Sequence, residues 1–304
     1  MITRRTLVAG AALAPLTAPH VACAQANRVV KMGSLRLIHS MTPHFYQRFA
    51  PVGLTIEIAT FDSPTDGKNA VVTRSVDFGG FGIAAATLGA AAGEPVVVIG
   101  AFCNRGMGVV ARAGSGIADI QGLRGKRVGI WPGSTQEVFI LERLRMEGMS
   151  IRDITSVRVP FGEMQAMLAR GDIDAYVGAE PGPGLSISSD VGTLVEYPYG
   201  TVMGGLNMIL GTSQAMIDAD PALCRTMLTI HRRASEHMMA NKAEVAEATV
   251  RILGAPRAAV DHALSAGNVE YTWNLDATVI RQSRAYAEQM LALRQIRRLP
   301  DFDR

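Results

Sequence analysis

The residues best suited to bind a ligand stand in the segment Gly133-Ser134-Thr135, between a predicted strand and a predicted helix. Two hydroxyls and several unpaired backbone N–H groups then meet at a helix N-terminus, and such an end attracts anions. The helix dipole contributes only about 0.3–1 kcal/mol, so hydrogen bonds must supply most of any affinity. The alternative is structural, because Ser134 followed three residues later by Glu137 has the spacing of a helix capping box.

A glycine-rich segment is the second candidate. Gly80, Phe81 and Gly82 belong to a predicted turn between a strand and a helix. Glycines there either let the backbone approach a ligand closely or only make the turn. The spacing is not that of a dinucleotide site, and no P-loop lysine follows.

Three further positions stand where predicted strands end. Glu180 closes a strand ahead of a Pro-Gly-Pro-Gly run, and a carboxylate at the carboxyl end of a strand often faces a ligand crevice. Surface placement of Glu180 is the open alternative. His39 follows the first predicted strand and Phe61 the second, so both are candidates to line a site, whereas helix capping and core packing are the structural readings.

Several classes of site have no support in the sequence. The histidines form neither H-x-x-x-H nor H-E-x-x-H, so no metal site is predicted, and no G-x-S-x-G elbow is present. Beyond residue 24 the cysteines are Cys103 and Cys224, which we expect to be buried free thiols. No cofactor is predicted.

The first 24 residues have the pattern of an export signal. A short basic start at Arg4-Arg5 precedes an apolar run, Leu7 to Leu16, and the small-x-small triplet Ala22-Cys23-Ala24 follows. The run is about half of the ~20 residues that a membrane-spanning helix needs. We expect cleavage near Ala24 and a periplasmic protein; the paired arginines indicate the twin-arginine route, with an ordinary secretory signal as the alternative.

Composition describes the remainder as a globular protein. Hydrophobic residues make up 48% and charged residues 19% of the 304-residue chain, which fits neither disorder nor a membrane bundle. Removing the signal lowers the net charge from +3 to +1, because the signal holds two arginines and no acidic residue. No nucleic-acid partner is therefore indicated.

Short β-like runs alternate with helix-like stretches, which favours an α/β fold. Strands are expected at 28–37, 54–60, 76–79, 95–100, 108–113, 127–130, 156–159, 175–178 and 206–211. Helices are expected at 42–49, 66–74, 83–92, 136–147 and 164–169, and from Pro221 onwards the chain reads as almost wholly helical.

The ordered set of these segments resembles the nitrate/sulfonate/taurine/bicarbonate-type binding proteins of ABC importers, which are NMT1/THI5-like. The segments are Ser75 to Gly79, Ala90 to Val98, Leu123 to Val128, Gly133 to Thr135, Gly171 to Ala175, Glu180-Pro181 and Gln295 to Phe302. The resemblance covers essentially the whole chain beyond the signal.

This resemblance implies a type II periplasmic-binding-protein fold, in which two α/β lobes are joined by two hinge strands with a ligand cleft between them. Lobe 1 would comprise residues 25–107 and 206–304, and lobe 2 residues 108–205. Hinges are expected near Arg112–Gly116 and Gly200–Leu206, and closure of the cleft would be a hinge motion.

The resemblance also implies a ligand-binding set and partners. The set is His39, Ser40, Phe61, Gly80, Phe81, Gly82, Ser134, Thr135, Glu137 and Glu180. The chain would be a monomer that captures a small organic or anionic ligand and delivers it to membrane permease and ATPase subunits, and it would not be an enzyme.

Two positions depart from the pattern of the family members that bind simple oxyanions: Glu137 stands where they often carry a neutral or basic residue, and Ala179 where they often have an aromatic. If Glu137 and Glu180 both face the cleft, they would repel a naked oxyanion and favour a taurine-like zwitterion or a thiamine-precursor pyrimidine. If Glu137 only caps its helix, this argument lapses. An enzyme on the same fold and a receptor that feeds a sensor are the remaining alternatives.

Overall fold

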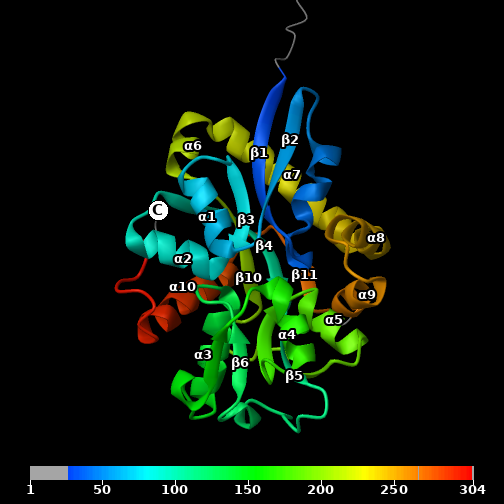
Figure 1. Cartoon of the computed structure of the whole chain (residues 1–304). Coiled ribbons are helices and arrows are strands. Elements are labelled where there is room, and N and C mark those ends of the chain that lie inside the picture. The colour runs from blue at the N-terminus through cyan, green and yellow to red at the C-terminus, as the bar shows by residue number, and fades with distance from the viewer. Residues whose placement is uncertain (1–26, 266, 303–304) are drawn as a thin grey trace, which may run out of the picture.

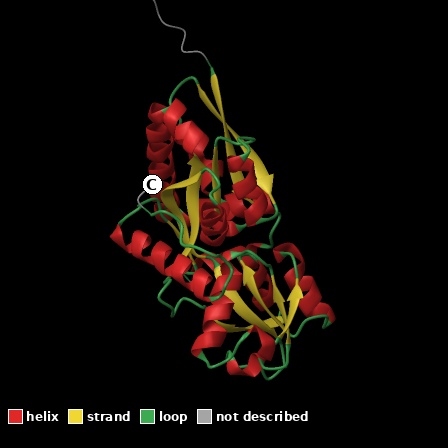
Figure 2. Cartoon of the chain, turned by 90° about the vertical axis from the view of Figure 1, so that its left-hand side faces the viewer, coloured by secondary structure: helices red, strands yellow, loops and turns green. Residues whose placement is uncertain are grey.

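The computed structural model describes residues 27–265 and 267–302, so the expected signal peptide lies outside the described residues. Two mixed sheets lie one above the other, each with helices packed against it (Figures 1 and 2). The strands are β1 Arg28–Leu35, β2 Leu54–Phe61, β3 Phe78–Gly82, β4 Val96–Arg105, β5 Met107–Arg112, β6 Arg127–Ile130, β7 Thr155–Arg158, β8 Ala175–Ala179, β9 Gly192–Glu196, β10 Leu206–Ser213 and β11 Val269–Tyr271.

The α-helices complete both layers. They are α1 Pro64–Val72, α2 Ile83–Ala92, α3 Thr135–Met146, α4 Met164–Arg170, α5 Gly182–Ser188, α6 Gln214–Ala219, α7 Pro221–Ala240, α8 Lys242–Leu253, α9 Arg257–Ser265 and α10 Ala277–Ala292. Short 3-10 helices occupy Ile38–Ser40, Thr42–Phe49, Gln121–Leu123, Ile151–Asp153 and Phe161–Glu163. Within the described part of the chain, no helix is both long enough and apolar enough to span a membrane.

Strand order confirms the predicted type II periplasmic-binding-protein fold. The first sheet has the order β11-β4-β10-β3-β1-β2 and the second β7-β6-β8-β5-β9. In the first sheet, β10 runs antiparallel between β3 and β4 although it follows the second sheet in the chain. The first sheet is therefore assembled from two separate stretches of sequence.

The chain passes between the sheets twice. The first passage is the single residue Gly106, which separates the end of β4 at Arg105 from the start of β5 at Met107. The expected hinge at Arg112–Gly116 is wrong, because residues up to Arg112 already pair within the second sheet. The second passage lies between the end of β9 at Glu196 and the start of β10 at Leu206.

Three elements differ from the sequence predictions. Residues 42–49 are helical as expected but form a 3-10 helix. Gly80 and Phe81 lie inside β3 and not in a turn, since the glycines leave room for neighbouring rings. The Pro-Gly-Pro-Gly run is not only a loop: a cis Glu180–Pro181 bond leads directly into α5, which begins at Gly182.

Two strands were missed. β9 alternates only weakly, with exposed Thr193 and Leu194 side by side. β11 is three residues long and pairs with the edge of β4, so it carries too few residues to show a period. Both cysteines are buried free thiols, as predicted.

Candidate ligand-binding cleft

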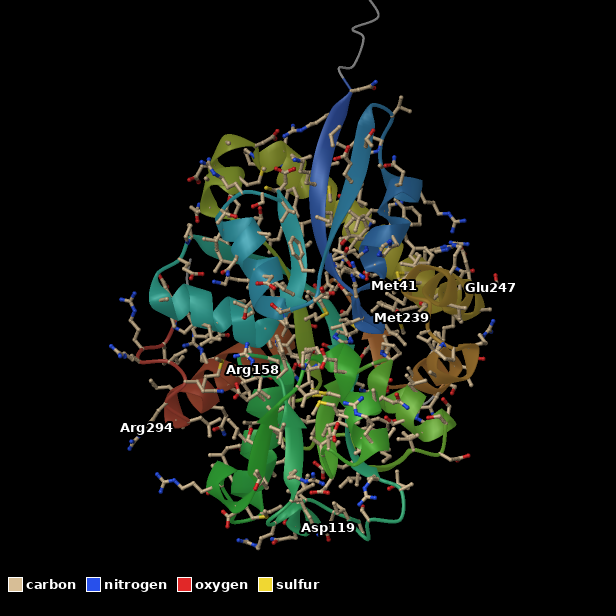
Figure 3. The ribbon with its side chains drawn as sticks, viewed as in Figure 1. Met41, Asp119, Arg158, Met239, Glu247 and Arg294 are labelled. Carbon is tan, nitrogen blue, oxygen red and sulfur yellow. The ribbon has the colours of Figure 1, made fainter. Side chains whose placement is uncertain are left out.

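The two sheets present the carboxyl ends of their parallel strands to each other. β1, β2 and β3 run parallel in the first sheet, and β6, β7 and β8 in the second. Arg158, the last residue of β7, lies where the two sheets meet, whereas Asp119 lies at the far end of the second layer (Figure 3). Loops that follow such strand ends commonly build ligand sites in α/β proteins.

Residues of both layers line a small inner cavity of about 10 Å³, room for about one water molecule. From the first layer come Leu35, Leu37, His39, Pro64, Gly82, Asn207 and Met208, and from the second Thr135, Gln136 and Phe161. Neither Lys nor Arg occurs among these lining residues.

Three helix N-termini converge on the inner cavity. Pro64 is the first residue of α1, Gly82 is the N-cap of α2, and Thr135 is the first residue of α3. The Oγ1 atom of Thr135 donates a hydrogen bond to the backbone oxygen of Asn207 at 3.3 Å, which links the second layer to the first. The positive ends of three helix dipoles therefore meet in one place.

His39 supplies a neutral polar group to the same cavity. The side chain is 1% exposed, and its Nδ1 atom has no hydrogen-bond partner among the described residues. Burial lowers the pKa of His39 to about 3, so the ring is uncharged at neutral pH. A Cβ atom at Gly106 would lie 2.8 Å from this Nδ1, and Gly106 has φ of +85°, so both the ring and the backbone require glycine there.

A larger outer cavity of about 510 Å³ adjoins the inner one, and Leu35, Leu37 and Phe161 line both. Its remaining walls are apolar for the most part, from Ala179, Pro181, Leu185, Ile252 and Leu253. Its polar side chains are Arg36, His44, Thr60 and Gln165. A cavity of this volume is in the range that small-molecule sites occupy.

The structure brings only part of the predicted set to these cavities. His39, Gly82 and Thr135 line the inner cavity. Ser40 does not line it, and its Oγ accepts a hydrogen bond from the backbone N–H of Leu35 at 2.8 Å. Ser134 caps α3 through the N–H of Glu137 at 3.1 Å. Both hydroxyls therefore hold the loops that carry the lining residues.

The aromatic and glycine candidates pack inside the first layer. Phe81 is fully buried in the core, and Phe61 is half-buried against it. A Cβ atom at Gly80 would lie 2.5 Å from Cζ of Phe102, so this glycine makes room for a ring.

Neither predicted carboxylate lines either cavity. Glu137 accepts hydrogen bonds from the Gly133 N–H at 2.8 Å and from Nε2 of Gln295 at 3.0 Å. Partial burial raises the pKa of Glu137. The argument from Glu137 for a cationic group on the ligand therefore lapses.

Glu180 is fully buried beside the first passage between the sheets. Its carboxylate accepts hydrogen bonds from the Gly184 N–H at 3.0 Å and from Nδ2 of Asn268 at 2.9 Å. Its own N–H donates to the backbone oxygen of Gly106 at 2.9 Å, and its backbone oxygen accepts from Ile38 at 3.1 Å. Burial raises the pKa of Glu180 to about 7.

Sequence reasoning missed seven of the lining residues of the inner cavity: Leu35, Leu37, Pro64, Gln136, Phe161, Asn207 and Met208. Pro64 carried a usable signal, because Ser63-Pro64 directly after a strand marks a helix start. Asn207 and Met208 carried none, since their position depends on β10 joining the first sheet.

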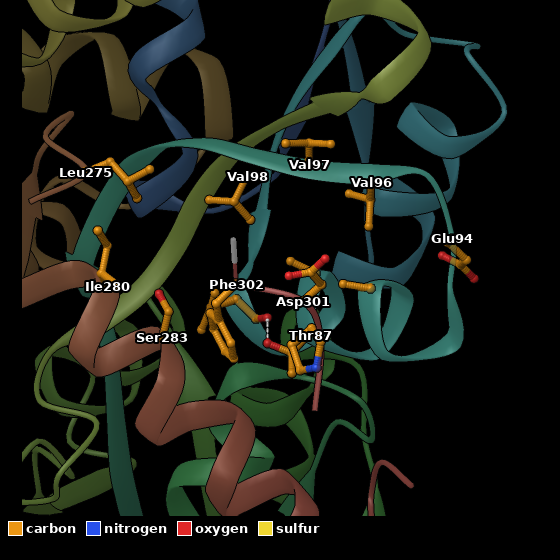
Figure 4. A pocket seen from close by; sticks show the side chains of 14 residues that line it. Thr87, Glu94, Val96, Val97, Val98, Leu275, Ile280, Ser283, Asp301 and Phe302 are labelled. Atoms are coloured by element: carbon orange, nitrogen blue, oxygen red, sulfur yellow. Dashed lines mark hydrogen bonds between the residues drawn. The ribbon is translucent and has the colours of Figure 1, made fainter. Parts of the chain in front are cut away.

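A separate cavity of about 220 Å³ lies within the first layer, away from the cleft (Figure 4). Its walls are α2, the start of β4, α10 and the C-terminal residues Pro300, Asp301 and Phe302. Among the described residues, no group of three or more His, Cys, Asp or Glu side chains is placed to hold a metal ion.

Comparison with known proteins gives three consistent results. The family model described as NMT1/THI5 like matches residues 48–245. The alkanesulfonate-binding protein of Xanthomonas axonopodis pv. citri, solved with MOPS bound, has a TM-score of 0.78 at 21% identity, covering 91% of this chain and 96% of that one. The periplasmic nitrate-binding protein of Synechocystis has a TM-score of 0.69 at 16% identity, covering 88% and 82%. At such identities these likenesses establish the shared fold.

One curated relative is an enzyme. The 4-amino-5-hydroxymethyl-2-methylpyrimidine phosphate synthase of Schizosaccharomyces pombe is 26% identical over 147 residues, which is 48% of this chain. The match spans 41% of the length of that relative.

Proposed function

The chain belongs to the NMT1/THI5-like family, and on that premise we propose that it is the exported substrate-binding protein of an ABC importer. It captures a small organic or anionic molecule of the sulfonate or nitrate class between its lobes and delivers it to a membrane permease and its ATPase. The expected division into lobe 1, residues 25–107 and 206–304, and lobe 2, residues 108–205, is part of this proposal, with the first boundary moved to Gly106 because Met107 pairs with Ala179 in the second sheet.

One observation carries the proposal: the inner cavity is lined from both lobes and receives three helix N-termini. Backbone N–H groups and dipoles directed at one point suit an anionic group. Because Thr135 and Gln136 come from one lobe and Gly82 and His39 from the other, a ligand held there is bound by both lobes at once. A ligand so held stabilises the closed arrangement, which is the form that a permease distinguishes from the open one.

The volumes of the two cavities limit the kind of ligand that the cleft can hold. The inner cavity of about 10 Å³ is too small for a sulfonate group, so the lobes would close around a bound ligand at a slightly wider separation than in this structure, by rotation at the passages. The outer cavity of about 510 Å³ already accommodates an organic body. We therefore favour an organic molecule with a polar head over a bare inorganic anion such as nitrate.

A second candidate function rests on the fungal pyrimidine-synthase relative. The same cleft would then hold a thiamine-precursor pyrimidine, with the neutral His39 and Gln136 as hydrogen-bonding groups and Phe161 as a stacking surface. Binding without turnover would make the chain a pyrimidine receptor, and turnover would make it an enzyme.

A thermal-shift screen tests both candidates. The panel contains alkanesulfonates, taurine, nitrate, bicarbonate, aromatic carboxylates and pyrimidines. A ligand at 100 times its dissociation constant adds about 2.7 kcal/mol, a clear rise in melting temperature. The shift should be lost in the double variant Ser134→Ala/Thr135→Ala and kept in Ser213→Ala, which removes the cap of α6 away from the cleft. If no compound of the panel raises the melting temperature of ligand-free protein, the proposal is contradicted.

A further inference from the structure

We infer that Arg36 is a specificity-determining residue, and that the ligand is an elongated organic acid with a second anionic group that Arg36 binds in the outer cavity. This inference rests on the proposed function, since it assigns one end of the ligand to the inner cavity. It adds a requirement at the other end, which the helix N-termini do not provide.

The inner cavity has mainly polar binding groups, whereas the outer cavity is mostly apolar. The inner one offers helix N-termini, Thr135 and Nδ1 of the buried His39, which has no partner within the described part of the chain. The shared residues Leu35, Leu37 and Phe161 form an apolar passage from there into the outer cavity. A ligand that spans both therefore has a polar head, an apolar body and a second end beside the outer wall.

Arg36 is the one Lys or Arg side chain among the residues that line either cleft cavity. It follows β1 directly, and its backbone N–H is held by the oxygen of Phe61 at 3.3 Å, so its position at the strand end is fixed. The other ionisable side chain of the outer cavity is His44, whose pKa burial lowers, so it remains neutral at neutral pH. Arg36 is thus the positive charge that a ligand meets there.

The present partner of Arg36 is easily displaced. Nε of Arg36 lies 3.3 Å from Oδ1 of Asp62, and the two side chains are 67% and 85% exposed. Ion pairs this exposed are screened by water and contribute little. In contrast, Arg48, which lines the neighbouring groove at the rim, is held at 2.9 Å by Glu244. A guanidinium that lines the cavity and is only weakly paired is suited to bind a carboxylate or sulfonate.

Calorimetric titration with matched ligands tests the inference. Alkane-1-sulfonates and α,ω-alkanedisulfonates of three to six carbons share the same body and differ in the second anion. The wild-type protein should bind the best disulfonate about tenfold more tightly than its monosulfonate. In Arg36→Met, which keeps the alkyl stem, this ratio should fall to about one, while monosulfonate affinity stays within about twofold.

Two further variants test whether the effect belongs to Arg36. Asp62→Asn releases Arg36 and should raise disulfonate affinity about two- to threefold. Arg170→Met removes a similarly exposed arginine, 61% exposed and paired with Asp172, which lines neither cleft cavity, and should leave the ratio unchanged. Monosulfonate binding with a disulfonate ratio that Arg36→Met does not alter would overturn the role of Arg36 alone. Failure of every sulfonate to bind would overturn the sulfonate function and this inference together.

Discussion

Nδ2 of Asn268 donates a 2.9 Å hydrogen bond to the carboxylate of Glu180, which joins the residue before β11 in the first sheet to the residue after β8 in the second. Nδ2 of Asn268 also donates to the backbone oxygen of Met107 at 3.2 Å, and Oη of Tyr199 lies 2.5 Å from Oδ1 of Asn268. Met107 begins β5 and Tyr199 lies in the second passage. Glu180 therefore sits where both connections between the sheets meet.

The first prediction concerns the pH dependence of stability through Glu180. Its pKa is raised from 4.5 to about 7 by burial, so the folded protein binds more protons than the unfolded chain between these values. The stabilisation that this group gives is complete below pH 4.5 and is lost as the pH rises to 7. The loss amounts to about 3 kcal/mol for a shift of this size.

Urea unfolding of wild type and Glu180→Gln at pH 5 and pH 8 measures this effect. The variant should gain stability relative to wild type by up to about 3 kcal/mol on going from pH 5 to pH 8. Comparison with the variant is needed because two buried histidines give the stability a pH dependence of the opposite sign. Burial lowers the pKa of His39 to about 3 and that of His231 to about 4, so these groups reduce the free energy of unfolding as the pH falls below 6.5. Glu247→Gln, at an exposed site, serves as the control. A constant difference between wild type and Glu180→Gln at both pH values would contradict the assignment.

The second prediction uses the close approach of the lobes at Gly82. A Cβ atom there would lie 2.6 Å from Oγ1 of Thr135 in the opposite lobe. Gly82→Ala should therefore hold the lobes apart. Ligand affinity should fall by more than about tenfold, because the ligand then loses at least one hydrogen bond or similar contact to the opposite lobe. Small-angle scattering should show a larger radius for this variant, and Gly82→Ala/Thr135→Ala should return towards the wild-type radius. In Gly200→Ala, no atom of residues 27–265 or 267–302 lies within 4 Å of the new Cβ, so this variant should do neither. A compact Gly82→Ala variant would argue against contact at this point.

The third prediction separates packing from binding in the glycine-rich strand β3. Gly80→Ala should destabilise the fold by about 1–3 kcal/mol, because its Cβ would overlap the ring of Phe102. Phe102→Leu in the same chain should recover part of that loss in urea unfolding. Ligand affinity of the folded Gly80→Ala protein should match wild type. A loss of affinity with unchanged stability would instead place Gly80 at the ligand.

The fourth prediction concerns Glu137. Glu137→Gln should lower the free energy of unfolding by about 1 kcal/mol, since it weakens the acceptor for the Gly133 N–H. It should leave the preference between taurine and ethanesulfonate unchanged, because this carboxylate lines neither cleft cavity. Calorimetry with the two sulfonates measures that preference. A lower affinity for taurine relative to ethanesulfonate in the variant would show that the Glu137 carboxylate contacts the ligand amine.

The fold could be predicted from the sequence because it depends on an ordered series of local patterns. The β-branched run before Gly100 and the capped helix after Ser134 are readable in isolation. Fewer of the residues that line the site could be predicted from the sequence. Residues that directly follow a strand or begin a helix, such as His39 and Thr135, were found. Phe161, Asn207 and Met208 were not, because which face of β10 or of the loop after β7 borders the cavity depends on the other lobe.

The late position of β10 in the sequence has a consequence for biosynthesis. β10 fills the gap between β3 and β4, yet it is made only after the whole of the second sheet. A nascent chain can complete the second sheet, a continuous stretch from Met107 to Glu196, while the first sheet still lacks its middle strand. The ribosome must reach Ser213 before β10 can join β3 to β4, and the edge strand β11 is made later still, so folding of this lobe is a late and long-range event.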